Sequence, residues 1–220
     1  MHRFIETIRF EKGSFHNLPY HNQRMNLTRS HFFGRHTPLY LENYLDPIAA
    51  YAAFPHAATS SDNGISTDSP APYRIKCRVE YAADILTIDY TPYHLRPVRT
   101  LRLTAADTFD YTYKSTDRLY LQTLFENRDG ADDILLTRHG YLTDTSICNI
   151  ALYDGHTWYT PLHPLLAGTQ RQALLDRGIL IVRSIPTRTL SHYTHLRLFN
   201  ALIPFGELHL PVTAILPSQN

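Results

Sequence analysis

Hydrophobic and polar residues alternate along residues 4–10, which is typical of a β-strand with one buried face. The turn-forming run at residues 11–14 follows, and it predicts a hairpin that returns through Phe15. The spacing of apolar residues becomes helical between Tyr20 and Phe33. Further strands are expected at residues 73–81, 85–90 and 98–103. The first half of the chain therefore predicts a β-rich sheet with one or two helices.

The second half changes character after Lys114 and mixes helices with buried strands. Helices are predicted at residues 117–127 and 169–177, with Gly178 ending the second. Strands are predicted at residues 133–137, 146–153, 179–182 and 196–202. We therefore expect an α/β (α+β) protein of two lobes, a smaller one at 1–104 and a larger one at 105–220. The polar segment 60–69 is expected to be a loop.

Composition places the chain among soluble globular proteins. Its 220 residues are 43% hydrophobic and 19% charged, and the formal net charge of +1 gives no general attraction to nucleic acid. Two cysteines suit a reducing compartment better than a secreted disulfide scaffold. We expect neither a signal peptide nor a membrane span, because no apolar run reaches about 18 residues. These features predict a cytoplasmic protein.

Lysine is scarce, which narrows the search for a reactive amine. Only three of the 21 basic residues are lysines: Lys12, Lys76 and Lys114. Lys12 falls in a predicted turn and Lys76 on the charged face of a predicted strand, so both fit solvated positions. Lys114 follows Tyr111 and Tyr113 where the two lobes are expected to meet, a common place for ligand pockets. This favours Lys114 weakly, and a solvated lysine is the simpler interpretation.

Two polar segments in the second half add candidate groups. Asp144, Ser146 and Asn149 interrupt apolar surroundings, although such residues also serve ordinary turns. Gly168 and Thr169 stand at the start of a predicted helix, where backbone N–H groups can bind a phosphate. The alternative, and the commoner case, is that Thr169 simply caps the helix. Histidine pairs such as His31/His36 and His192/His195 lack metal-ligand spacing, so no metal site is expected.

A lysine, a carboxylate and a phosphate site together suggest pyridoxal phosphate chemistry. The order of these parts resembles the class IV aminotransferases, the fold-type IV family of pyridoxal phosphate enzymes. The resemblance extends over nearly the whole chain, through the segments 4–9, 21–25, 113–114, 131–136, 142–150, 159–161, 166–171 and 199–202. It implies a two-lobed fold with the cofactor in the cleft between the lobes.

The resemblance also implies roles for individual residues. Lys114 matches the lysine that bonds covalently to the cofactor and later moves the proton between cofactor and substrate carbons. Arg24 matches the arginine that grips the cofactor phosphate. Asp144 stands where the family usually has glutamate, opposite the pyridinium nitrogen, so its shorter side chain must reach as far.

The remaining matches lie on the cofactor side of the larger lobe. Thr169 and the backbone after Gly168 match the phosphate site at a helix start. Asn200 sits where the family places another polar contact on the phosphate side, and Asn149 belongs to the same cofactor-binding set. The resemblance further implies a homodimer that acts on a small amino substrate, without nucleic acid or membrane.

The reaction itself is less tightly specified than the cofactor. The segment 199–202 and the short chain favour 4-amino-4-deoxychorismate lyase, which forms 4-aminobenzoate and pyruvate for folate biosynthesis. An amino-acid transaminase of the branched-chain or D-amino-acid type is the alternative, because both reactions use the same lysine, carboxylate and phosphate grip. A second alternative is a binding protein that has lost the cofactor, against which Lys114, Asp144 and Arg24 argue.

Overall fold

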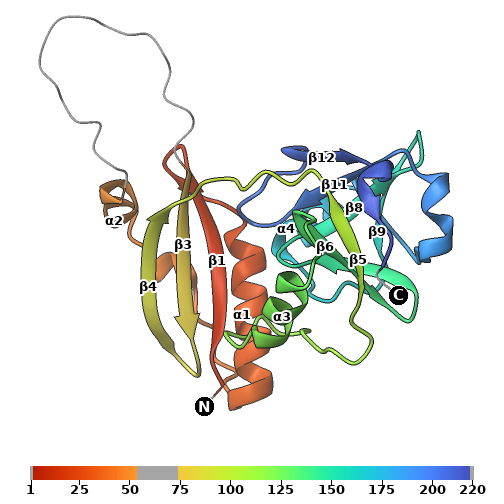
Figure 1. Cartoon of the computed structure of the whole chain (residues 1–220). Coiled ribbons are helices and arrows are strands. Elements are labelled where there is room, and N and C mark those ends of the chain that lie inside the picture. Colours follow the sequence, from red (N-terminus) through yellow and green to blue (C-terminus); the bar gives the residue numbers. More distant parts are fainter. Residues whose placement is uncertain (1, 54–73, 219–220) are drawn as a thin grey trace, which may run out of the picture. The chain divides into compact units, whose positions relative to one another are not determined.

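The computed structural model describes residues 2–53 and 74–218, which form two compact units (Figure 1). One unit is Ile5–His94, and the other joins the first residues through Phe4 to the segment from Leu95 onward. The structure thus divides the chain between His94 and Leu95, where sequence analysis placed the boundary at 104/105. The polar loop expected at residues 60–69 lies outside the described residues.

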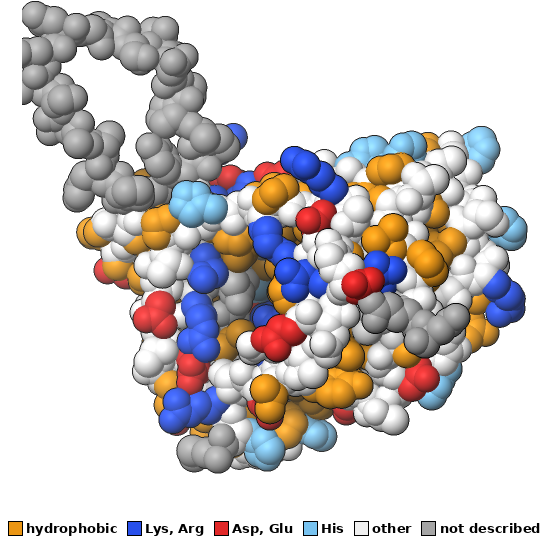
Figure 2. All heavy atoms as spheres, viewed as in Figure 1, with side chains coloured by type: hydrophobic (Ala, Val, Ile, Leu, Met, Phe, Trp, Pro, Cys, Tyr) orange, Lys and Arg blue, Asp and Glu red, His pale blue; other side chains and the backbone are white. Residues whose placement is uncertain are grey.

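A four-stranded sheet forms the frame of the unit Ile5–His94. Its strands are β1 (Phe4–Glu11), β2 (Ser14–Phe15), β3 (Arg74–Tyr81) and β4 (Ile85–Pro92), in the order β2-β1-β3-β4. Buried and half-buried residues alternate along β3, where Ile75, Cys77 and Val79 are fully buried and their neighbours are half-buried. One face of the sheet is therefore covered and the other is partly open. Figure 2 shows Lys and Arg side chains gathered over this sheet. The predicted hairpin is confirmed, with Phe10 opposite Phe15.

Helices supply the core of this unit from the apolar side. They are α1 (Leu18–Phe33), the short η1 (Leu41–Asn43) and α2 (Pro47–Ala52). α1 ends at Gly34, whose φ of 63° lies in the left-handed region that favours glycine. α2 starts at Asp46, whose side chain accepts a hydrogen bond from the Ile48 N–H. Ala50 of α2 joins Phe10 and Ile75 of the sheet in one hydrophobic cluster.

The unit from Leu95 onward is built on a nine-stranded sheet. The strand order is β10-β9-β8-β7-β6-β5-β13, and β11 pairs with both β8 and β12. The strands are β5 (Leu101–Ala105), β6 (Asp133–Arg138), β7 (Tyr141–Thr145), β8 (Asn149–Tyr153), β9 (Trp158–Pro161), β10 (Ile181–Arg183), β11 (His195–Phe199), β12 (Leu208–Pro211) and β13 (Ile215–Leu216). The helices are α3 (Leu119–Glu126), α4 (Thr169–Asp176), η2 (Thr187–His192) and η3 (Val212–Ala214). The expected mixed α/β fold is confirmed.

The prediction of a single strand at residues 146–153 is wrong at its start, because the strand β8 begins at Asn149. The structure has two antiparallel strands there, β7 and β8, which pair Asp144 with Asn149. The turn between them forms because the Thr145 hydroxyl accepts the Cys148 N–H at 3.0 Å, and the Cys148 carbonyl accepts the Thr145 N–H at 2.8 Å. The strand β7 therefore ends at Thr145, whose hydroxyl binds a backbone amide of the turn, although the apolar pattern of the sequence continues through residues 146–148.

Among the described residues, no helix is long and apolar enough to cross a membrane. The longest, α1, has 16 residues and buries polar side chains such as His21 and Asn22.

Candidate active site

Asp144 is a buried carboxylate in the unit from Leu95 onward. Its Oδ1 accepts a hydrogen bond from Asn149 Nδ2 at 2.8 Å, and its Oδ2 accepts the Leu166 N–H at 2.8 Å. Only 4% of the residue is exposed. Burial raises the pKa of Asp144 to about 6, although both hydrogen bonds and the charge of Arg171 act in the opposite direction. A group that brings a positive charge to this carboxylate would therefore be bound favourably.

Asn149 connects Asp144 to the start of α4. Its Nδ2 also donates to the Leu166 carbonyl at 2.8 Å. A Cβ atom on Gly168 would lie 1.9 Å from Asn149 Oδ1, so this close approach requires glycine. The family resemblance places Asn149 and Gly168 in one set of cofactor-binding residues, and the structure brings them into contact.

The start of α4 is held by backbone rather than by a side-chain cap. Gly168 occupies the N-cap position and has no side chain to offer, and Thr169 is the first helical residue. The alternative in which Thr169 caps the helix is therefore wrong. Thr169 is buried, and the helix begins with the positive end of its dipole beside the Asp144–Asn149 pair. This is the geometry of an anion site at a helix N-terminus.

Arg171 lies within electrostatic reach of Asp144, and sequence reasoning did not single it out. It is buried in the first turn of α4, where its Nη2 donates to the Pro161 carbonyl at 2.8 Å and its Nε to Thr160 Oγ1 at 3.2 Å. Burial lowers the pKa of Arg171, and the charge of Asp144 opposes this effect. The signal in the sequence is an arginine three residues after Gly168, within the segment 166–171 that carries the family resemblance.

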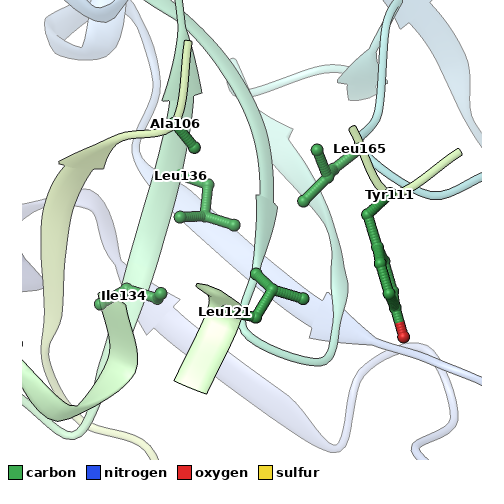
Figure 3. Close-up of a cluster of buried hydrophobic side chains, with 6 residues drawn as sticks. All are labelled: Ala106, Tyr111, Leu121, Ile134, Leu136 and Leu165. Atoms are coloured by element: carbon green, nitrogen blue, oxygen red, sulfur yellow. The ribbon is translucent and has the colours of Figure 1, made fainter. Parts of the chain in front are cut away.

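Lys114 lies in a loop that is fixed on both sides. The preceding Tyr111 belongs to a buried cluster with Leu165, completed by Ala106, Leu121, Ile134 and Leu136 (Figure 3). The Tyr111 hydroxyl donates to the Ser115 carbonyl at 2.9 Å, and Ser115 forms a β-bridge with Phe4. Lys114 itself is half-buried. Leu165 packs on the loop of Lys114 while the adjacent Leu166 binds Asp144, so one segment supports both groups.

Residues 146–148, the turn between β7 and β8, are tied to two other elements. Arg118 donates from Nη2 to the Ser146 carbonyl at 2.6 Å, which links this turn to the start of α3. Asn200 Nδ2 donates to the Ile147 carbonyl at 3.2 Å, and its Oδ1 accepts the Leu202 N–H at 2.8 Å. The Asn200 side chain thus holds two turns, and its predicted phosphate contact stays a prediction.

Arg24 lies in the unit Ile5–His94, where it pairs with a buried carboxylate. Its Nε donates to Glu6 Oε1 at 2.9 Å and its Nη2 to Glu6 Oε2 at 2.5 Å, a two-pronged arrangement. His21 Nδ1 lies 2.6 Å from the same Oε2. Burial would raise the pKa of Glu6, but the charges and hydrogen bonds of Arg24 and His21 outweigh it and lower the pKa to about 2. Sequence reasoning singled out Arg24 and missed Glu6, which fixes its guanidinium.

Comparison with known proteins gives one family over nearly the whole chain. The sequence matches the profile described as amino-transferase class IV over residues 3–214. An uncharacterized protein of Haemophilus influenzae is 29% identical over 202 residues, 92% of this chain and 98% of its own.

Solved structures agree with this match. The crystal structure of a candidate 4-amino-4-deoxychorismate lyase from Haemophilus somnus 129PT has a TM-score of 0.76 and 31% identity, covering 92% of this chain and 97% of that one. A hypothetical aminotransferase of Mycobacterium tuberculosis in its pyridoxal phosphate-bound form has a TM-score of 0.69, covering 94% of this chain and 81% of that one. At 15% identity, this second likeness concerns the fold alone.

Proposed function

Because this chain belongs to the amino-transferase class IV family, we propose that it is a pyridoxal phosphate-dependent enzyme that cleaves 4-amino-4-deoxychorismate into 4-aminobenzoate and pyruvate. The observation that carries the proposal is the buried Asp144, held by Asn149 and the Leu166 N–H directly before the start of α4. A carboxylate in that place is suited to a ring cation, and the helix start is suited to a phosphate.

The donor set of the described residues fits this cofactor. Asp144 lacks an ion pair within the part of the chain that the structure describes, and its raised pKa reflects the cost of burying a carboxylate. A protonated pyridine ring would supply the missing positive charge. Pyridoxal phosphate, when bound, withdraws electrons from the bonds of the substrate carbon that carries the amino group.

Lys114 provides the amine for covalent attachment and for proton transfer. Its loop is anchored by the Tyr111–Ser115 hydrogen bond, which limits where the amine can move. An amine held in this way can take a proton from one atom of the substrate and return it to another. Asp144 keeps the ring nitrogen protonated, and Asn149 fixes the orientation of that carboxylate.

The backbone at Gly168 and Thr169 would bind the phosphate, and the family resemblance assigns Arg24 to the same group. The backbone N–H groups of the first turn of α4 point out of the start of the helix, which is the positive end of its dipole. The Arg24 guanidinium is fixed by Glu6, so it would lose little conformational freedom when it binds an anion. Asn200 would contribute on the phosphate side through the turn that it holds.

The lyase reaction is favoured over transamination by similarity. The Haemophilus somnus protein is 31% identical over 97% of its length and is described as a candidate 4-amino-4-deoxychorismate lyase. Transamination stays the alternative, because the family includes both reactions and the residues above would serve either. Lyase activity in the cytoplasm would supply 4-aminobenzoate for folate biosynthesis, and the free, buried Cys77 and Cys148 are compatible with reducing conditions.

Two measurements test the proposal. Borohydride reduction of the purified holoenzyme, followed by peptide mapping, should place the pyridoxyl label on Lys114. A label on Lys12 or Lys76 would overturn that assignment. Incubation of the unreduced holoenzyme with aminodeoxychorismate should release pyruvate and 4-aminobenzoate in equal amounts. A separate incubation with amino acids and 2-oxoglutarate should form no glutamate. Glutamate formation without pyruvate release would establish the transaminase instead.

The proposal includes a homodimer, as the family resemblance implies. Sedimentation velocity of the holoenzyme across a hundredfold range of concentration should give twice the mass of one chain. A fully active monomer would contradict this part of the proposal and leave the reaction unaffected.

A further inference from the structure

A cavity lies within the unit from Leu95 onward, and of the residues discussed above it is lined by Leu165. Its volume is about 790 Å³, within the usual range for small-molecule sites. The hairpin between β6 and β7, the loop after β9 and the segment after β10 line it. Lys114, Asp144, Asn149 and Gly168 are not among the lining residues.

The charged side chains that line this cavity are cationic, while the carboxylates of Asp107 and Asp110 lie just outside the lining. Of its thirteen lining residues, Arg138, His139 and His163 can carry a positive charge, and none is an aspartate or glutamate. Arg138 is exposed at the end of β6. It forms no close ion pair among the described residues, although its charge acts on Asp110. The His139 N–H donates to Asp107 Oδ1 at 2.7 Å, which fixes the tip of the hairpin on which both residues lie.

Apolar side chains form the rest of the wall. Leu142, Leu165 and Ile185 line the cavity and are themselves buried, so its floor is rigid. The hydroxyls of Thr112 and Thr143 are already engaged, because they donate to Asp110 Oδ1 and to the Leu136 carbonyl. Besides the hydroxyls of Tyr141 and Ser184, the cationic side chains are therefore the polar side chains of the lining that remain to bind a ligand.

We propose that this cavity binds a small carboxylate with an aromatic or branched apolar body, at a site separate from the proposed reaction. The apolar floor would take the body of such a ligand, while Arg138 would pair with the carboxylate through two parallel hydrogen bonds. A neutral ligand of the same shape would leave that pairing unused, and a phosphate would leave the apolar floor uncovered.

Calorimetric titration with benzoate, and with benzamide as its neutral match, tests this inference. The protein is the holoenzyme after borohydride reduction, so that the cofactor position at Lys114 is already filled, and the variants below distinguish the cavity from the substrate position. Benzoate should bind at one site per chain, and benzamide at least tenfold more weakly. Should the chain hold no cofactor, the same titration is performed on the protein as purified, so that the two proposals fail independently.

Variants locate the site. Arg138→Gln should weaken benzoate binding about tenfold or more, and Ser184→Phe, which places a ring in the opening, should abolish it. Arg177→Gln changes an exposed arginine outside the cavity and should leave the affinity unchanged. Equal affinity for benzoate and benzamide, or undiminished binding in both Arg138→Gln and Ser184→Phe, would overturn the proposal.

Discussion

Asn149 donates a hydrogen bond from its side-chain amide to the Asp144 carboxylate at 2.8 Å, across the pairing of β7 and β8. The same amide donates to the Leu166 carbonyl, and the Leu166 N–H donates to Asp144. Three residues from three segments thus form a closed set of hydrogen bonds around one buried carboxylate. Because each partner is fixed by the next, the position of Asp144 is set before any ligand binds.

The pH dependence of stability should report the buried state of Asp144. Its pKa is raised from 3.8 to about 6, so its contribution to stability is fully present below pH 4 and is lost as the pH rises through 6. The shift corresponds to roughly 3 kcal/mol. The stability of Asp144→Asn relative to the wild type should therefore rise by about that amount between pH 4 and pH 7, measured by urea unfolding of the cofactor-free protein.

The comparison needs a control for the general effect of removing a charge. Asp176→Asn alters an exposed carboxylate in α4, and its stability relative to the wild type should change little over the same pH range. A flat difference for Asp144→Asn as well would mean that Asp144 is not desolvated.

Substitution of Gly168 should act through Asn149. The added methyl group of Gly168→Ala would meet Asn149 Oδ1 at 1.9 Å, while the backbone φ of −72° suits alanine. We expect a loss of about 1–3 kcal/mol in the free energy of unfolding. Gly168→Ala made in an Asn149→Ala background should cost much less, because the clashing atom is gone. Equal costs in the two backgrounds would refute this coupling in a double-mutant cycle.

Glu6 should stabilise the unit Ile5–His94 at neutral pH. Its pKa is lowered from 4.5 to about 2, so its contribution is present above pH 4.5 and is lost as the pH falls through 2. Glu6→Gln should lower the free energy of unfolding by roughly 3 kcal/mol at pH 7, and by much less near pH 2. Glu126→Gln, at an exposed position in α3, is the control and should have little effect at either pH. A loss of the same size at both pH values would show that packing, not charge, is responsible.

Tyr111 should hold the loop of Lys114 through its hydroxyl. Tyr111→Phe keeps the ring in its cluster and removes the hydrogen bond to the Ser115 carbonyl, at a cost of about 1 kcal/mol. Amide hydrogen exchange of Ser115 and Thr116 should become faster, since their backbone is less restrained. Tyr120→Phe, which alters a more exposed tyrosine in α3, should leave these rates unchanged. Unchanged rates in Tyr111→Phe would contradict the role given to the hydroxyl.

The sequence by itself determined most of the elements and the identity of the family. Alternation in β1 and β3 and the helical spacing of α1 are local patterns, because one buried face imposes its own period on the chain. The order of motifs from Phe4 to Asn200 indicated a class IV aminotransferase, and the sequence profile and the fold agree with it. Lysine scarcity left few candidates for a reactive amine.

Only the tertiary structure decided how the polar groups are held. The turn at residues 146–148 looked like continuing strand, because the Thr145 hydroxyl that satisfies its amides leaves no mark in an apolar pattern. Glu6 sits 18 residues before Arg24, and Asn149 meets Gly168 across two strands and a loop. Such contacts depend on which surfaces pack together. The periodic pattern of buried residues in one element shows which of its faces is buried, but not which residues of another element pack against that face. For that reason the sequence indicated Arg24 and Gly168, and the fold showed why the first needs a buried carboxylate and the second can have no side chain.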